Sequence, residues 1–189
     1  MRTESVVFLR GVNVGKHKRF RPAELARDLP FDVMNVGAAG TFVVRARVDE
    51  AILRAALARA LPFEAEAMIC RGGDLLALTR EEAFADGVVP PDTQRFVSVM
   101  AAPRRDPPRV PISHPPGKEW QVKVVAFNGP FALSLWRRVG ERPLYPNEVL
   151  ERALGIPFTT RNWSTILRVC ALLEEAKGSY GPAGAPQPR

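Results

Sequence analysis

The hydrophobic pattern of the first seventy residues constrains the fold more strongly than any other feature of this 189-residue chain. Ser5 to Arg10 begins with a continuous apolar run that contains β-branched and aromatic residues, which is typical of a buried strand. The patterns that follow predict, in order, a helix from Pro22, strands over 32–36 and 41–48, a helix after Asp49 and a strand over 63–70. This order is the split β-α-β arrangement of ferredoxin-like domains.

The second half contains a similar set of elements in a changed order. The predicted elements are strands over 95–100, 120–127 and 131–136, a helix from Pro146 and a last helix that begins near Thr160. Gly155 and Pro157 mark the end of the first of these helices.

We therefore predict an α+β protein of two ferredoxin-like α/β-sandwich subdomains with mainly antiparallel sheets. The N-terminal subdomain covers residues 1–90, and the C-terminal α+β subdomain covers residues 91–176. A single α+β domain is the alternative. Residues 177–189 contain too few apolar side chains to pack and are predicted to be a disordered tail.

The chain is basic, with 27 Lys and Arg against 20 Asp and Glu, a net charge of +7. Such a surface attracts phosphate-bearing partners, unless the excess charge is spread evenly. No apolar run approaches the ~20 residues of a membrane span, and the first residues do not resemble a signal peptide. Cys70 and Cys170 are too few for a disulfide framework and are expected to be buried free thiols. We expect a cytoplasmic protein that does not bind membranes, whose oligomeric state is left open.

The first candidate site is the polar loop after the first strand. It contains Arg10, Gly11, Asn13, Gly15 and Lys16. A phosphate-binding P-loop needs four residues between its glycines and Ser or Thr after the lysine, and this loop has neither. A weaker anion-binding nest of backbone amides remains, with charge from Lys16, Lys18, Arg19 and Arg21. The alternative is that the glycines shape a turn and the cations are solvated.

The second candidate site is Thr159 to Trp163, at the predicted start of the last helix. A threonine hydroxyl can cap the helix, while Arg161 and Asn162 can hold a carboxylate or phosphate at its positive end. Capping and core packing without any ligand are the alternative.

The remaining polar residues suggest no catalytic or metal chemistry. His17 and His114 are the two histidines, and no Cys, His or Asp spacing predicts a metal site or a cofactor. The proline-rich segment 103–116 has three arginines that either contact nucleic acid or belong to an exposed linker, namely Arg104, Arg105 and Arg109.

Three segments together resemble the bacterial domain of unknown function (DUF) 1697 family, namely Leu9–Gly15, Pro22–Leu25 and Thr159–Thr165. The resemblance extends over about residues 5–174. It implies a cytosolic protein of two ferredoxin-like parts, and no activity, cofactor or catalytic residue. The family usually has Gln-Ser-Gly-Asn before its third strand, where this chain has Ala38-Ala39-Gly40-Thr41. If those polar groups line a shared pocket, this chain lacks part of it.

The leading functional hypothesis is a binding protein for a phosphate-bearing small molecule or nucleic acid. The basic loop supplies charge, and Arg161, Asn162 and Thr160 supply hydrogen bonds. One alternative is an enzyme that acts on a small anionic metabolite between the halves, with Arg161 orienting it and Asn13 or Thr160 polarising it. Another is an assembly module that uses an exposed sheet edge. The shared-site hypotheses require the two candidate segments to face one pocket.

Overall fold

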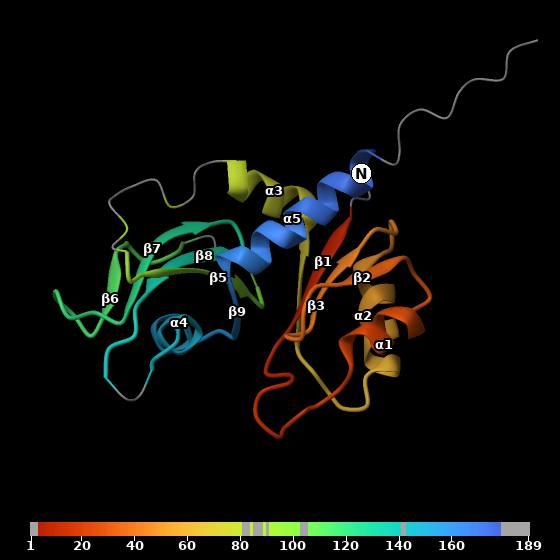
Figure 1. Cartoon of the computed structure of the whole chain (residues 1–189), viewed down its shortest axis with the longest axis horizontal. Helices are drawn as coiled ribbons and strands as arrows, with labels where there is room; N and C mark the ends of the chain where they lie inside the picture. The colour runs from red at the N-terminus through yellow and green to blue at the C-terminus, as the bar shows by residue number, and fades with distance from the viewer. Residues whose placement is uncertain are drawn as a thin grey trace, which may run out of the picture.

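The computed structural model describes residues 4–80, 84, 89, 91–102, 106–140 and 143–178. The N-terminal half contains β1 (Ser5–Leu9), α1 (Pro22–Asp28), β2 (Val33–Asn35), β3 (Thr41–Val44), α2 (Glu50–Ala60) and β4 (Ala67–Arg71). Its strands form one sheet in the order β2-β3-β1-β4, with antiparallel neighbours throughout (Figure 1). This is the ferredoxin-like arrangement that the sequence predicts.

The β1 strand is buried on both faces, which explains its continuous apolar sequence. Val7 and Leu9 pack in the core beneath α1 and α2, whereas Val6 and Phe8 face a second core on the other side of the sheet. Asp49 caps α2 as predicted, because its side chain accepts a hydrogen bond from the backbone N–H of Ala51.

The rest of the chain contains α3 (Gly72–Arg80), β5 (Gln94–Met100), β6 (Ile112–His114), β7 (Val122–Asn128), β8 (Phe131–Trp136), α4 (Pro146–Leu154), β9 (Phe158–Asn162) and α5 (Trp163–Gly178). The second sheet has the order β6-β7-β8-β5-β9, again with antiparallel neighbours. Without β6, its order of second, third, first and fourth strand is that of the N-terminal sheet. The described part of the connection between its first two strands contains β6 and no helix. The predicted α+β fold with two mainly antiparallel sheets is confirmed.

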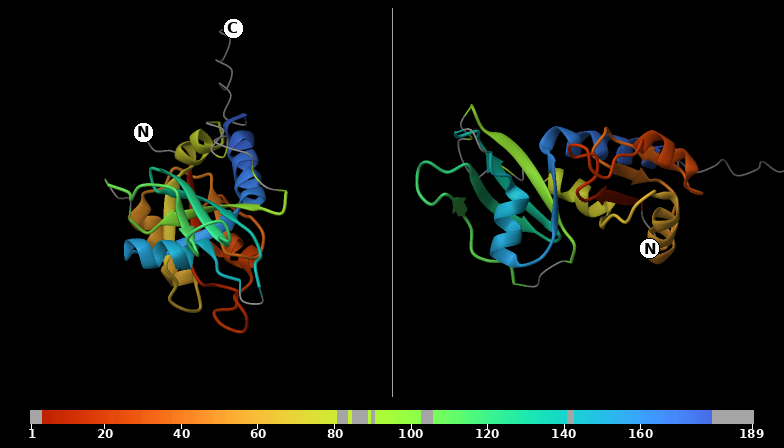
Figure 2. Two further views of the ribbon diagram at one scale, coloured as in Figure 1. Left: turned by 90° about the vertical axis from the view of Figure 1, so that its left-hand side faces the viewer. Right: turned by 90° about the horizontal axis from the view of Figure 1, so that it is seen from below.

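The two sheets share a core that contains α3 and α5 (Figures 1 and 2). Side chains of β1, β4, β5 and β8 meet there with both helices, including Met68, Leu75, Val97, Leu133 and Val169. The other face of each sheet is covered separately, by α1 and α2 in the N-terminal half and by α4 in the C-terminal half. The halves are therefore joined by apolar packing as well as by the chain.

Several predicted boundaries are corrected by the structure. The predicted strands 41–48 and 63–70 are shorter, ending at Val44 and beginning at Ala67. The proline-rich segment includes β6, whereas Arg104 and Arg105 lie outside the described residues. The last helix begins at Trp163 and not near Thr160, because residues 158–162 pair with β5 as an edge strand.

The C-terminal part of the chain confirms some predictions and corrects another. Gly155 adopts the predicted left-handed cap with φ 67°, and Cys70 and Cys170 are buried and free. The predicted tail begins too early, since α5 continues to Gly178, and residues 179–189 lie outside the described residues. The predicted division at residues 90 and 91 stays a prediction. Within the described parts of the chain, no helix has the length and apolarity to span a bilayer.

Candidate functional site

The two polar segments predicted from the sequence lie beside each other, at the turn formed by residues 37–40. The Asn13 side chain donates from Nδ2 to the carbonyl oxygen of Ala38 at 2.8 Å. Arg161 donates from Nη2 to the carbonyl oxygen of Ala39 at 2.6 Å. The segments are thus neighbours, but their donors point to the protein's own backbone.

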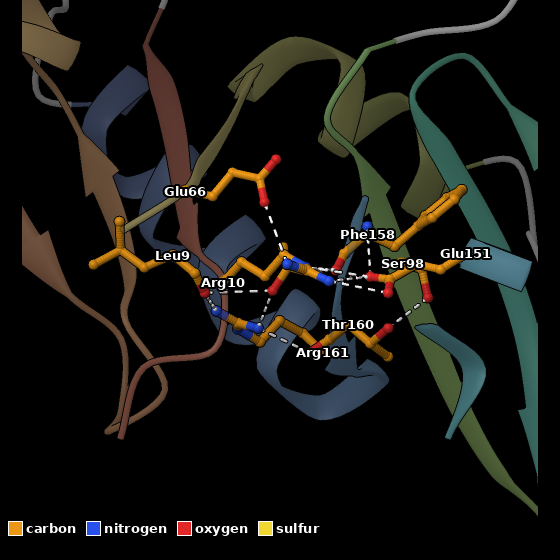
Figure 3. Close-up of polar contacts among 9 residues, drawn as sticks. Leu9, Arg10, Glu66, Ser98, Glu151, Phe158, Thr160 and Arg161 are labelled. Atoms are coloured by element: carbon orange, nitrogen blue, oxygen red, sulfur yellow. Dashed lines mark hydrogen bonds and ion pairs between the residues drawn. The ribbon is translucent and has the colours of Figure 1, made fainter. Parts of the chain in front are cut away.

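Arg161 is only 8% exposed and extends from β9 into the N-terminal half (Figure 3). Its five N–H groups all have protein acceptors. The Nε–Thr41 Oγ1 distance is 2.7 Å, the Nη1–Thr159 Oγ1 distance is 2.9 Å and the Nη2–Leu9 O distance is 2.8 Å. The other two donors face the carbonyl oxygens of Thr160 and Ala39.

None of these acceptors is a carboxylate, so Arg161 is a buried cation held by oxygen dipoles and by the ring of Phe8, whose centroid lies 5.7 Å away. Burial lowers the pKa of Arg161 to about 10, which leaves the guanidinium charged at neutral pH. A ligand would have to displace a protein acceptor to bind it. In the structure Arg161 therefore connects the two halves, and its ligand-binding role stays a prediction.

Asn162 and Thr160 are also used by the fold. Asn162 Oδ1 accepts from the backbone N–H of Thr165 at 2.9 Å and caps α5, where the sequence suggested a threonine. Thr160 lies inside β9, and its Oγ1 is 2.7 Å from Ser98 Oγ on β5. The Asn162 oxygen and the Thr160 hydroxyl are thus both engaged within the protein.

Arg10 links the two halves by an ion pair. Its Nη2 lies 2.8 Å from Oε1 and 3.0 Å from Oε2 of Glu151 on α4, and its Nε donates to Phe158 O at 3.1 Å (Figure 3). Nη1 also lies 3.4 Å from Glu66. Arg10 therefore connects the halves with two carboxylates as partners, and its role as a charge for a ligand stays a prediction.

The glycine-containing loop after β1 is shaped by left-handed residues. Gly11, Asn13, Gly15 and Lys18 have φ angles of 64°, 54°, 59° and 46°. Asn13 holds the loop closed, since its Oδ1 accepts from the backbone N–H of Phe20 at 3.0 Å while its Nδ2 is bonded to Ala38. The loop extends away from the N-terminal sheet, at the lower edge of the view in Figure 1.

Most arginines in the described N-terminal half belong to an ion pair, whereas three cations of this loop do not. Lys18 donates to the carbonyl oxygen of Glu64 at 2.7 Å, and Arg19 Nε donates to the carbonyl oxygen of Gly15 at 2.9 Å. Carbonyl oxygens are neutral, so these bonds leave both charges uncompensated. Lys16 is exposed, and none of Lys16, Lys18 and Arg19 belongs to an ion pair among the described residues. Arg21, by contrast, pairs with Glu24 at 2.8 Å.

A groove of about 980 Å³ lies at the base of the loop. Its polar lining consists of Asn13, Arg19, Arg21, Glu24, Asp28 and Asn35. The Oδ1 atom of Asn35, the last residue of β2, is buried and has no hydrogen-bond partner among the described residues. Sequence reasoning missed Asn35, although asparagine is disfavoured in strands and its presence there is a detectable signal.

The residues expected to form an enzyme site form hydrogen bonds within the protein, and the enzyme hypothesis stays a prediction. Asn13, Thr160 and Arg161 all direct their polar atoms at protein groups. Across the described residues, no cluster of three or more His, Cys, Asp or Glu side chains is arranged to hold a metal ion.

The comparisons with known proteins bear on the fold and not on the function. No family model and no curated protein matches the chain. Among solved structures, a conserved bacterial protein from Streptococcus pneumoniae is similar over 90% of this chain and 98% of its own, with a TM-score of 0.57 and 14% sequence identity. At this identity the likeness extends to the arrangement of elements and not to a site.

Proposed function

We propose that this protein binds a phosphate-bearing ligand through its basic loop, as a cytoplasmic protein of the DUF1697 type that its motifs resemble. One observation supports the proposal above others: Lys16, Lys18 and Arg19 lie together on an exposed loop with no acidic partner among the described residues. A phosphate gains from such charges without the loss of an existing ion pair. Arg161 and Asn162 take no part in the proposed site.

The loop's conformation also suits an anion. Its left-handed residues turn the chain tightly, and such turns can bring backbone N–H groups into one concavity. The oxygen and the nitrogen of the Asn13 side chain both form hydrogen bonds that fix the turn. Little conformational entropy is therefore lost when a ligand binds.

The test is fluorescence anisotropy with labelled single-stranded RNA and DNA over a range of salt concentrations. For single strands the logarithm of the binding constant falls by about 0.7 per neutralised phosphate for each logarithmic unit of salt. Three free loop cations therefore predict a slope near ~−2. The double variant Lys16→Glu, Arg19→Glu should weaken binding and flatten this slope.

A matched control separates the effect of the loop cations on binding from the effect of the protein's net charge. Arg152→Glu, Arg168→Glu makes the same change in net charge on exposed positions of α4 and α5. Retained binding in this control, with loss in the loop variant, supports the proposal. Equal loss in both variants, or binding that is insensitive to salt, contradicts it.

A further inference from the structure

The groove at the base of the basic loop contains an unusual polar group. Asn35 lines the groove, and its Oδ1 atom is inaccessible to water and unpartnered among the described residues. A buried acceptor without a donor is disfavoured, because it loses its hydrogen bonds to water and gains none. Rotation about the Cβ–Cγ bond of asparagine is soft, so the amide can turn this oxygen toward a donor that enters the groove.

The walls around Asn35 are largely apolar. They are formed by Phe20, Pro22, Leu25, Ala60 and Pro62. Phe20 is held in place by an edge-to-face contact with Phe63, with ring centroids 5.8 Å apart. A flat, apolar, partly aromatic ligand fits such walls better than a sugar phosphate or a bare anion.

The charged groups of the groove have both signs. Arg19 and Arg21 lie on the loop and at the start of α1, whereas Glu24 and Asp28 lie further along that helix. Arg19 forms no ion pair among the described residues and is available to a phosphate. The carboxylates accept hydrogen bonds from hydroxyl or amino groups and repel a second anion.

We propose that the groove accepts the base and sugar of a nucleotide, with Asn35 bound to the base edge and Arg19, the loop cation that lines the groove, bound to its phosphate. An amide offers a donor and an acceptor side by side, the pattern by which proteins recognise base edges. The groove volume of about 980 Å³ suits a ligand of this size. This inference rests on the proposed phosphate-binding function and adds the chemical class of the ligand.

The test compares ligands that share parts of a nucleotide, by isothermal titration calorimetry at low salt. The probes are the four common nucleoside 5′-monophosphates, ribose 5-phosphate, inorganic pyrophosphate and the unphosphorylated nucleosides. At least one monophosphate should bind ten-fold or more tightly than ribose 5-phosphate. A labelled RNA pentanucleotide shows which form of nucleotide the groove binds. Tighter binding than that of the monophosphate indicates that the ligand is single-stranded RNA, and weaker binding indicates that it is a free nucleotide.

Three variants assign the contacts. Asn35→Ala removes an unpartnered atom, so it should fold, weaken monophosphate binding about ten-fold and leave ribose 5-phosphate binding unchanged. Asp28→Asn changes an exposed residue that lines the groove and is a second test of groove binding. It should change monophosphate binding without altering the fold. Lys16→Glu, Arg19→Glu should weaken both phosphates.

The outcomes separate the two proposals. Equal binding of monophosphates and ribose 5-phosphate, with no effect of Asn35→Ala, overturns the nucleotide inference and leaves phosphate binding intact. Nucleoside binding that needs Asn35 but not the loop cations overturns the phosphate proposal and supports the base-binding groove. No binding of any probe overturns both.

Discussion

Replacement of Arg161 by methionine tests whether this side chain is a structural connection between the halves. Methionine keeps an unbranched apolar chain of similar length but removes all five donors. Ala39 O and Thr41 Oγ1 then lose the guanidinium as a donor, whereas Leu9 O keeps a hydrogen bond from the Thr159 hydroxyl at 3.3 Å.

The expected loss follows from these acceptors. Hydrogen bonds from a charged donor contribute about 1.5–3 kcal/mol each, but they share one desolvation cost and are not additive. The acceptors are neutral, so no buried charge is left behind, and each buried acceptor that loses its donor costs about 1–3 kcal/mol. Ala39 is exposed, so water can replace the guanidinium at its carbonyl. We therefore expect a decrease of about 3 kcal/mol in the free energy of unfolding, or ~6–12 °C in the melting temperature.

The assay is urea denaturation followed by circular dichroism, with linear extrapolation to water. Arg168→Met, at an exposed position of α5, is the matched control and should change stability by less than about 0.5 kcal/mol. Arg161→Lys retains the charge without the planar five-donor group, so its loss should be intermediate. A loss below about 1 kcal/mol for Arg161→Met, less than the cost of one buried acceptor without a donor, would refute the reasoning.

Two further predictions concern the turn and the shared core. Gly40 and Gly37 both have positive φ, but a Cβ on Gly40 would lie 2.7 Å from Val12 Cγ2, whereas one on Gly37 meets no atom within 4 Å. Gly40→Ala should therefore lower the unfolding free energy by more than about 2 kcal/mol, and Gly37→Ala by about 1 kcal/mol, in the same urea assay. Equal losses would contradict the close approach. Burial raises the thiol pKa of both Cys70 and Cys170, so thiolate is scarce in the fold. Both thiols should react slowly with Ellman's reagent at pH 8 and rapidly in urea. Their contribution to stability is present below the ordinary thiol pKa of 9.0 and decreases as the pH rises above it. Fast labelling of the folded protein would contradict this burial.

The N-terminal fold could be predicted because its sequence signals are local. The apolar run of β1 and the Asp49 cap are each decided by residues within a few positions of one another. Thr159 and Thr160 show the limit of this reasoning. Both are β-branched and favour a strand, and in the structure this preference prevails over the capping tendency of their hydroxyls.

The role of Arg161 could not be predicted from the sequence because its partners are distant. Leu9, Ala39 and Thr41 precede it by 120 or more positions, and their carbonyl and hydroxyl groups give no charge pattern to detect. A guanidinium in a polar motif has the same sequence signature whether its acceptors belong to a ligand or to the protein. Only the packing of the halves distinguishes the two.

The turn formed by residues 37–40 connects this structural role to the proposed binding site. Arg161 bonds to the carbonyl of Ala39, and Asn13, which shapes the basic loop, bonds to the neighbouring carbonyl of Ala38. Ala38 also lines the groove. No described residue of the C-terminal half lines that groove, yet this half fixes the turn on which the loop is held. Loss of Arg161 should therefore alter ligand binding through the position of the loop, without any direct contact between Arg161 and the ligand.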